Sequence, residues 1–295
     1  MTYEPSYLKL YEEGILQESI EKLNIVLRNC TLCPHECKVD RLSNKKGICG
    51  AGGQIEISSA FAHFGEEKPL VGKYGSGTIF LTHCNLKCIF CQNYDISHQR
   101  NGRKATIEQL ADSMLELQIA GCSNINLVTP THVIAAIAAT IELARKKGLT
   151  LPTVYNTGGY DSVETLKLLE GLIDIYMPDM KYYDSKVAGE LSVAPDYPEI
   201  NFAAVKEMQR QVGDLKVEKG LATRGLLVRH LVLPENLAGS KRIIDFLAKE
   251  ISPRTTINIM GQYRPCYHAF SNPKINRPPT IEKINSAKQY AIKKA

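Results

Sequence analysis

Two hydrophobic periodicities alternate along the chain from about residue 77 onward. Short β-rich apolar runs are followed by longer amphipathic runs, in which apolar residues recur every three or four positions. This alternation is typical of βα units on a parallel sheet. The predicted strands lie at 78–82, 124–129, 153–156, 174–177, 226–233 and 256–260.

Local signals place the helices between these strands. Thr106 and Gln109 predict a capping box at the start of a helix over about 106–120, and Asp161 and Glu164 are predicted to cap the helix after the third strand. Because a closed barrel of the usual kind needs eight βα units, the sequence predicts an α/β fold with a partial (β/α)6 TIM-type barrel. Functional residues should then follow the strands, at their carboxyl ends.

The N-terminal part of the chain has a different pattern. Helical spacing over 15–27 is followed by a cysteine-rich stretch full of turn residues, 30–53. We therefore expect a small N-terminal Cys-rich appendage, with a helix and a metal-binding segment over 1–75 and the partial barrel over 76–295.

Composition favours a soluble protein. Apolar residues make up 44% of the 295 residues, and no apolar run approaches the roughly 18 residues of a membrane span. The first residues lack the basic and apolar runs of a secretory signal, so we expect a cytoplasmic protein without a membrane partner. The net charge of +5 comes from scattered Lys and Arg residues, which makes a nucleic-acid partner unlikely. Seven of the nine cysteines form two tight clusters, which in a reducing compartment indicates metal binding.

One cysteine cluster follows the first predicted strand. Cys84, Cys88 and Cys91 have the spacing C-x3-C-x2-C, at the position where this architecture has its active site. A [4Fe–4S] cluster normally takes four thiolates, so three leave one iron open for a substrate or cofactor. The alternatives are a fourth ligand from Cys122 or Cys266, which would give an electron-transfer centre, or a structural zinc.

The other cluster lies in the N-terminal segment. Cys30, Cys33, Cys37 and Cys49 supply four thiols, the number that closes a site. A zinc ion or an auxiliary iron–sulfur cluster would each satisfy them, and such a site would stabilise a segment that is too polar to pack by itself. Thiols that bind nothing are the remaining interpretation.

The C-x3-C-x2-C spacing, with the aromatic Phe90 before the third cysteine, resembles the radical S-adenosylmethionine (SAM) superfamily. The runs 75–80, 91–93 and 227–234 look like the activating enzymes of pyruvate formate-lyase, and most like a branch whose substrate is not established. The resemblance covers about 75–290, and the N-terminal cysteine segment is similar to that branch too.

The resemblance implies an enzyme that binds a [4Fe–4S] cluster and SAM. One electron from the reduced cluster would cleave SAM to methionine and a 5′-deoxyadenosyl radical, which abstracts hydrogen from the substrate. A flavodoxin or ferredoxin is implied as electron donor. The radical would activate a glycyl radical enzyme or another protein, or would act on a small molecule or peptide. The rival class is an iron–sulfur electron carrier or a zinc-binding protein without SAM chemistry.

The resemblance also implies which residues bind the cofactor. The implied positions are Phe90, Asn93, Thr129, Thr131, Asn156, Asp179, Lys181 and Arg229. Thr129 and Thr131 depart from the Gly-Gly-Glu of related enzymes, which contacts the methionine amino group, and His132 has the alternative interpretation of a residue at a helix N-terminus. Arg229 would bind the methionine carboxylate, with a salt bridge to Asp179 as the alternative.

Overall fold

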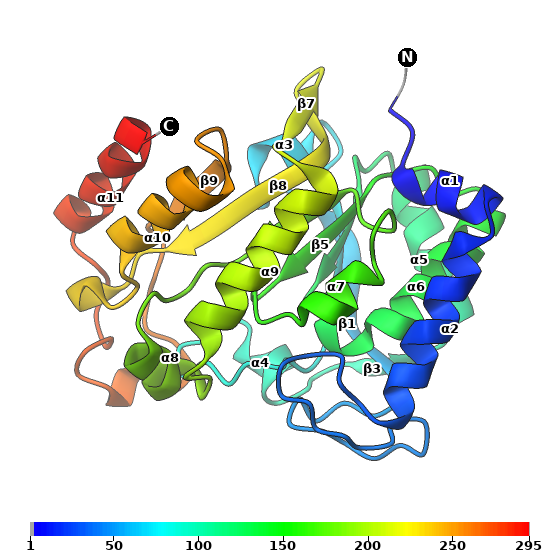
Figure 1. Ribbon diagram of the computed structural model, residues 1–295, viewed down its shortest axis with the longest axis horizontal. Helices are drawn as coiled ribbons and strands as arrows, with labels where there is room; N and C mark the ends of the chain where they lie inside the picture. The colour runs from blue at the N-terminus through cyan, green and yellow to red at the C-terminus, as the bar shows by residue number, and fades with distance from the viewer. Residues whose placement is uncertain (1–2, 295) are drawn as a thin grey trace.

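The computed structural model describes residues 3–294, and the strands within this range form one mixed sheet (Figure 1). Six strands run parallel in the order β2-β4-β5-β6-β8-β9, while β1, β3 and β7 are antiparallel to their neighbours. The bounds are β1 Ile55–His63, β2 Ser76–Leu81, β3 Arg103–Ala105, β4 Ile125–Val128, β5 Thr153–Thr157, β6 Ile175–Pro178, β7 Lys216–Glu218, β8 Leu221–Leu231 and β9 Thr256–Met260.

The α-helices within the described range mostly follow the strands. Their bounds are α1 Ser6–Glu12, α2 Ile15–Arg28, α3 Lys68–Val71, α4 Tyr94–Ser97, α5 Ile107–Ile119, α6 Ile134–Lys146, α7 Val163–Lys167, α8 Ser185–Ser192, α9 Tyr197–Val212, α10 Ser240–Phe246 and α11 Ile281–Lys294. Short 3-10 turns lie at Thr131–Val133, Pro234–Asn236 and Tyr267–Ser271, and a π-helical turn lies at Leu247–Ile251.

The six predicted βα strands are confirmed, and they form an open partial barrel. The structure adds three strands that the sequence analysis did not predict. The short strands β3 and β7 are largely exposed and show no apolar periodicity, so the sequence carried no signal for them. β1 pairs with β2 across position 75, so the sheet continues over the predicted domain boundary. The division into 1–75 and 76–295 stays a prediction.

The local helix signals had mixed outcomes. Thr106 and Gln109 form the predicted capping box at the start of α5. The prediction that Asp161 caps α7 was wrong, because the Ser162 side chain accepts the backbone N–H of Thr165 instead. Asp161 is drawn into the interior, where three hydroxyl groups donate to its carboxylate.

The two faces of the parallel strands have separate roles. On the outer face, residues such as Ile79, Leu127 and Tyr176 are fully buried in the main core beneath the helices. On the inner face, Leu70 of α3 packs against Val154 and neighbouring apolar residues near the amino ends of the strands. The chain between β1 and β2 therefore closes the barrel at the amino ends of its strands, and the carboxyl ends stay available for a site.

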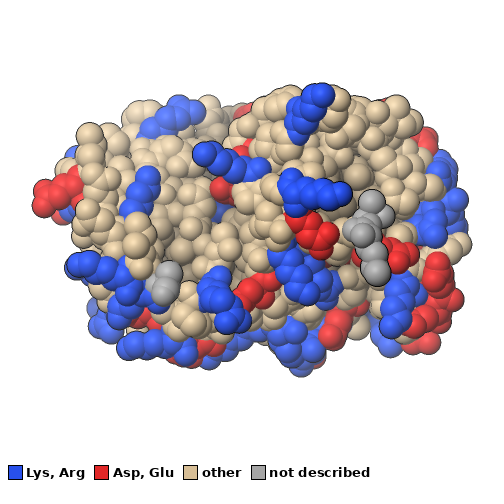
Figure 2. Space-filling view, turned by 90° about the horizontal axis from the view of Figure 1, so that it is seen from above, with Lys and Arg blue, Asp and Glu red and all other residues tan. Residues whose placement is uncertain are grey.

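Charges of both signs are distributed over the surface of the protein. Figure 2 shows Lys and Arg side chains interspersed with Asp and Glu over one face of the molecule. Within residues 3–294, no helix combines the length and the apolar character that a bilayer crossing requires.

Candidate functional site

A cavity of about 270 Å³ lies at the carboxyl ends of the parallel strands. Its lining brings together residues from the loop after β2, from β5 and β8, and from the loop after β6. The sequence-predicted residues that line it are Cys84, Cys88, Phe90, Cys91, Asn93, Thr129, Asn156, Asp179, Lys181 and Arg229. The position agrees with the rule that barrel sites form at this edge.

The three cysteines occupy one wall of the cavity, on the loop between β2 and α4. The loop is docked on α8, because the backbone N–H groups of Lys87 and Ile89 donate to the carbonyls of Ser192 and Leu191. Phe90 is buried and packs edge-on against Tyr182 and Tyr263. These contacts fix the position of the loop that carries the three thiols.

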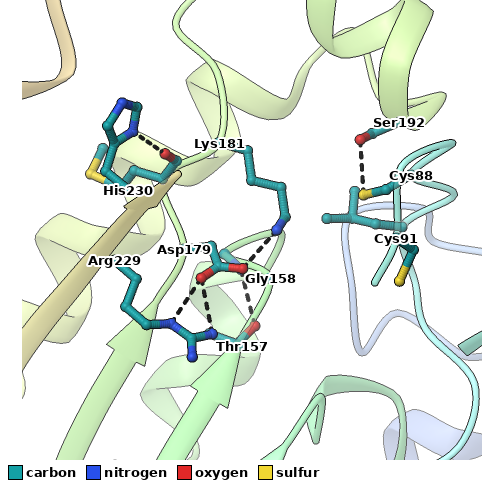
Figure 3. Close-up of polar contacts among 12 residues, drawn as sticks. Cys88, Cys91, Thr157, Gly158, Asp179, Lys181, Ser192, Arg229 and His230 are labelled. Atoms are coloured by element: carbon teal, nitrogen blue, oxygen red, sulfur yellow. Dashed lines mark hydrogen bonds and ion pairs between the residues drawn. The ribbon is translucent and has the colours of Figure 1, made fainter. Parts of the chain in front are cut away.

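Each of the three sulfurs has a polar neighbour. Leu86 N donates to Cys84 Sγ at 3.4 Å, Ser192 Oγ donates to Cys88 Sγ at 2.9 Å (Figure 3), and Cys91 Sγ lies 3.2 Å from Ser97 Oγ. Burial raises the pKa of the Cys84 thiol to about 12 and also raises the pKa of Cys88. Thiols with a raised pKa are protonated at neutral pH, but they lose the proton when they bind cationic iron, and the surrounding hydrogen-bond donors then stabilise the negative charge on sulfur.

The opposite wall carries a charged cluster of Asp179, Lys181 and Arg229 (Figure 3). Lys181 Nζ lies 2.6 Å from Asp179 Oδ2, and Arg229 Nε donates to Asp179 Oδ1 at 3.0 Å. Burial alone would raise the pKa of Asp179, but the two cations lower it below its ordinary value. Burial would likewise lower the pKa of Lys181, but Asp179 raises it, so all three groups are ionised at neutral pH.

A hydrogen bond joins Asn156 on β5 to Arg229 on β8. Arg229 Nη2 donates to Asn156 Oδ1 at 2.7 Å. The salt bridge between Arg229 and Asp179, the alternative from the sequence, is present in the structure. Lys181, in contrast, uses a single carboxylate partner and keeps further N–H donors for a group in the cavity.

The segment after β4 departs from the expected contacts. Thr129 lines the cavity in a left-handed backbone conformation, with φ of 60°, and its N–H donates to the Asn156 carbonyl. Thr131 does not line the cavity, because its hydroxyl donates to the buried Asp161 at 2.7 Å. His132 is the second residue of the 3-10 turn Thr131–Val133 and is buried, with Nε2 donating to the Thr82 carbonyl. Neither Thr131 nor His132 lines the cavity.

Sequence reasoning missed Glu66, which enters the lumen from the loop before α3. Glu66 Oε2 accepts hydrogen bonds from Asn126 Nδ2 and Asn156 Nδ2, and Oε1 lies 3.6 Å from Arg229 Nη1. The only signal in the sequence is an acidic pair, Glu66-Glu67, in a turn-rich loop. Such a pair is normally a solvated surface feature, so nothing pointed to the barrel interior.

The N-terminal thiols lie in the loop over 29–54, close to the cysteine wall of the cavity. His35 Nε2 lies 2.7 Å from the Asn85 carbonyl, next to Cys84. The backbone N–H of Ile48 donates to Cys37 Sγ at 3.3 Å, and the backbone N–H groups of His35 and Ala51 act to lower the pKa of Cys33 and Cys49 against the larger effect of burial. The thiols are near enough to raise one another's pKa, as Cys30, Cys37 and Cys49 do for Cys33, although burial is the larger cause there.

All nine cysteines are free thiols. Among residues 3–294, no three His, Cys, Asp or Glu side chains form a group that could hold a single metal ion as they stand. An iron–sulfur cluster distributes its thiolates over several irons, so the wall of Cys84, Cys88 and Cys91 is a different kind of site.

Fold and site together define an α/β protein with an open barrel, a cysteine wall and a facing charged wall. A family model described as the Radical SAM superfamily matches residues 78–247, and the chain belongs to this superfamily. It is 31% identical to the uncharacterized protein MJ0674 of Methanocaldococcus jannaschii over 97% of this chain and 81% of the relative. Identity to the uncharacterized protein MJ0808 of the same organism is 24%, over 92% and 80% of the two chains.

Two solved structures resemble this protein in fold. One is Streptococcus suis SuiB bound to the precursor peptide SuiA, with a TM-score of 0.50 and 14% identity over 71% of this chain and 43% of SuiB. The other is HydG, a maturase of the [FeFe]-hydrogenase, with a TM-score of 0.49 and 16% identity over 71% of this chain and 48% of HydG. The chain thus spans less than half the length of either protein. At this identity the likeness to SuiB concerns the fold, and it agrees with the open barrel.

Membership of the superfamily implies a [4Fe–4S] cluster and SAM. The residues present fit both groups. Three thiols from one loop supply the cluster ligands, and the amide, carboxylate and ammonium groups of the facing wall suit a ligand that carries charges of both signs.

Proposed function

We propose that this protein is a radical SAM enzyme of the pyruvate formate-lyase activating enzyme type. It binds a [4Fe–4S] cluster on Cys84, Cys88 and Cys91 and binds SAM in the adjoining cavity. The observation that carries the proposal is the common cavity, in which the three thiols face the polar wall of Asn156, Asp179, Lys181 and Arg229. An electron carrier would need the thiols, but it would not need a charged wall beside them.

Cys84, Cys88 and Cys91 would hold the cluster, which when reduced would supply the electron for cleavage of SAM to methionine and a 5′-deoxyadenosyl radical that takes a hydrogen atom from the substrate. The protein's own residues bind, orient and exclude water. Lys181 presents N–H donors to the methionine carboxylate, and Asp179 holds the ammonium group of Lys181 in place. Phe90 packs against Tyr182 and Tyr263, which holds the cysteine loop in position and shields it from water.

The partners follow from the electron and hydrogen balance of this reaction. One electron must enter from outside, for which we propose a flavodoxin or ferredoxin, and one hydrogen atom must come from a substrate, for which we propose a glycine of a partner protein. A cytoplasmic location suits both the labile cluster and such carriers. Support for these partners comes from the sequence resemblance.

The second cysteine set is proposed to bind zinc or an auxiliary cluster. Support comes from the backbone N–H groups aimed at Cys33, Cys37 and Cys49, since such donors stabilise thiolates bound to a metal. Binding one ion would require a local contraction of the loop, because the side chains do not already form a single-ion site. Zinc and iron contents of the anaerobically purified protein decide between the two metals.

The proposed function is tested by anaerobic reconstitution of the cluster, reduction with dithionite, addition of SAM and detection of 5′-deoxyadenosine by mass spectrometry. We expect product from the wild-type protein and none from Cys88→Ala, which should also lose the cluster's absorbance. Cys33→Ala is the matched control, because it removes a thiol of the other set and should retain SAM cleavage. A fully loaded wild-type cluster that yields no 5′-deoxyadenosine refutes the proposal.

A further inference from the structure

Two carboxylates, Glu66 and Glu67, contact side chains of the parallel strands beneath the cavity, and the proposed function assigns them no role. Both lie between β1 and α3, in the segment that closes the barrel at the amino ends of its strands. Glu66 contacts Asn126, Asn156 and Arg229, which come from β4, β5 and β8. Its side chain is 10% exposed, so a charged group is held inside the barrel at a desolvation cost. A buried carboxylate with three partners on three strands calls for an explanation.

The contact with Asn156 determines how that amide is oriented. A carboxylate only accepts hydrogen bonds, so the Nδ2 group of Asn156 must point down to Glu66, at 3.2 Å. The Oδ1 atom then points to Arg229 Nη2, at 2.7 Å. Both ends of the amide are therefore held at once. Replacing Glu66 by a residue without its charge leaves Nδ2 without a strong acceptor.

The contact with Arg229 completes a balance of charge. The Arg229 guanidinium contacts both Asp179 and Glu66. Lys181 contacts the second carboxylate oxygen of Asp179 (Figure 3). The two cations are thus opposed by Asp179, which lines the cavity, and by Glu66 beneath it, and Glu67 adds further negative charge near Arg229. SAM carries an ammonium, a sulfonium and a carboxylate, so its net charge is positive. Loss of Glu66 would therefore remove negative charge from beneath a positively charged ligand.

We infer that Glu66 is a positioning residue: it acts from the floor of the barrel to hold Asn156 and Arg229 in the arrangement that SAM meets. It touches neither SAM nor the reacting atoms, and it works through these two side chains. The inference rests on the proposed function, because it concerns the SAM site of that reaction.

The test is equilibrium binding of SAM to protein that carries the oxidised cluster, where no electron is available for cleavage. Glu66→Gln should weaken SAM binding by roughly tenfold, the effect of losing a hydrogen bond to a charged group. Glu66→Asp keeps the charge but shortens the side chain, and it should weaken binding as well if position matters. Glu67→Gln is the matched control, because Glu67 pairs with Asn258 and should change the affinity by less than about threefold.

A double-mutant cycle tests the route of the effect. In an Asn156→Ala background, the further change Glu66→Gln should have a clearly smaller effect than in the wild-type protein, since contacting residues are coupled. Thermal unfolding and iron content of every variant verify that the fold and the cluster are retained. If Glu66→Gln does not fold, Glu66→Asp carries the same cycle.

The outcomes separate this inference from the proposed function. Unchanged SAM affinity in both Glu66 variants overturns the inference alone, as does a full effect of Glu66→Gln that persists without Asn156. Equal weakening by Glu66→Gln and Glu67→Gln would show a general charge effect and would also overturn it. A wild-type protein with a loaded cluster that binds no SAM overturns the proposed function, and the inference with it.

Discussion

The hydrogen bond from Ser192 to Cys88 offers the most direct test of how the protein tunes its cluster. Ser192 Oγ lies 2.9 Å from Cys88 Sγ and 2.7 Å from the hydroxyl oxygen of Tyr182, so the three groups form a short chain at the end of α8. A donor to a thiolate stabilises the more negative, reduced cluster. Ser192→Ala removes that donor and should therefore lower the reduction potential.

The size of the shift follows from one hydrogen bond. A net contribution of about 0.5–1.5 kcal/mol is typical, and a tenfold change in equilibrium, about 1.4 kcal/mol, corresponds to about 59 mV for one electron. If most of the bond's contribution is gained on reduction, Ser192→Ala lowers the potential by roughly 20–60 mV. Tyr182→Phe removes the second link of the chain and should give a smaller shift in the same direction, because it weakens the Ser192 donor indirectly.

The assay is an anaerobic redox titration followed by electron paramagnetic resonance, with iron content measured in parallel. Ser113→Ala is the control, since its hydroxyl bonds to the Gln109 carbonyl on an exposed helix face, and its potential should match wild type. The double variant of Ser192 and Tyr182 should equal Ser192→Ala. An unchanged or raised potential in Ser192→Ala, at full iron content, would refute the reasoning.

Three further predictions concern stability and binding. Arg41 is buried and donates to the carbonyls of Gly52 and His132, so Arg41→Ala should lower the free energy of unfolding by about 3 kcal/mol in urea titration; a loss below about 1 kcal/mol contradicts this. Burial, helped by the Arg41 charge, lowers the pKa of His132 to about 3. The stability that neutral His132 contributes is therefore complete above the unfolded pKa of about 6.5 and is lost as pH falls toward 3, so that the free energy of unfolding drops by about 2 kcal/mol at pH 5. If the free energy of unfolding falls equally steeply between pH 7.5 and 5 in His132→Gln, His132 is not the cause. Lys181→Met should weaken SAM binding at least roughly tenfold in the equilibrium assay, and wild-type affinity would remove Lys181 from the site.

Much of the fold was available from local patterns. Apolar runs of strand length predicted the six parallel strands, and the amphipathic runs between them predicted intervening helices. The capping box at Thr106 predicted where one of these helices begins. The extra strands β1, β3 and β7 were not predicted, because strands at the sides of a sheet bury less apolar surface and show weaker alternation. The misassigned cap at Asp161 has a similar cause, since a buried network claimed a side chain that local rules place at a helix end.

The candidate site shows the same division. The spacing of Cys84, Cys88 and Cys91 determined by itself that three thiols lie on one loop, because ligands so close in the chain cannot be far apart in space. Of the cofactor contacts that the resemblance implied, Asn156, Asp179, Lys181 and Arg229 line the cavity, whereas the hydroxyl of Thr131 donates to Asp161.

Only the tertiary structure decided which charges meet. Glu66 reaches Arg229 from a loop more than 160 positions earlier, and Ser192 reaches Cys88 from a helix beyond the next four strands. Such contacts depend on how the barrel closes around its lumen, and no periodicity or spacing records them. The sequence alone thus determined the thiols and the βα order. The tertiary structure determined the partners that orient and neutralise the groups around the cavity.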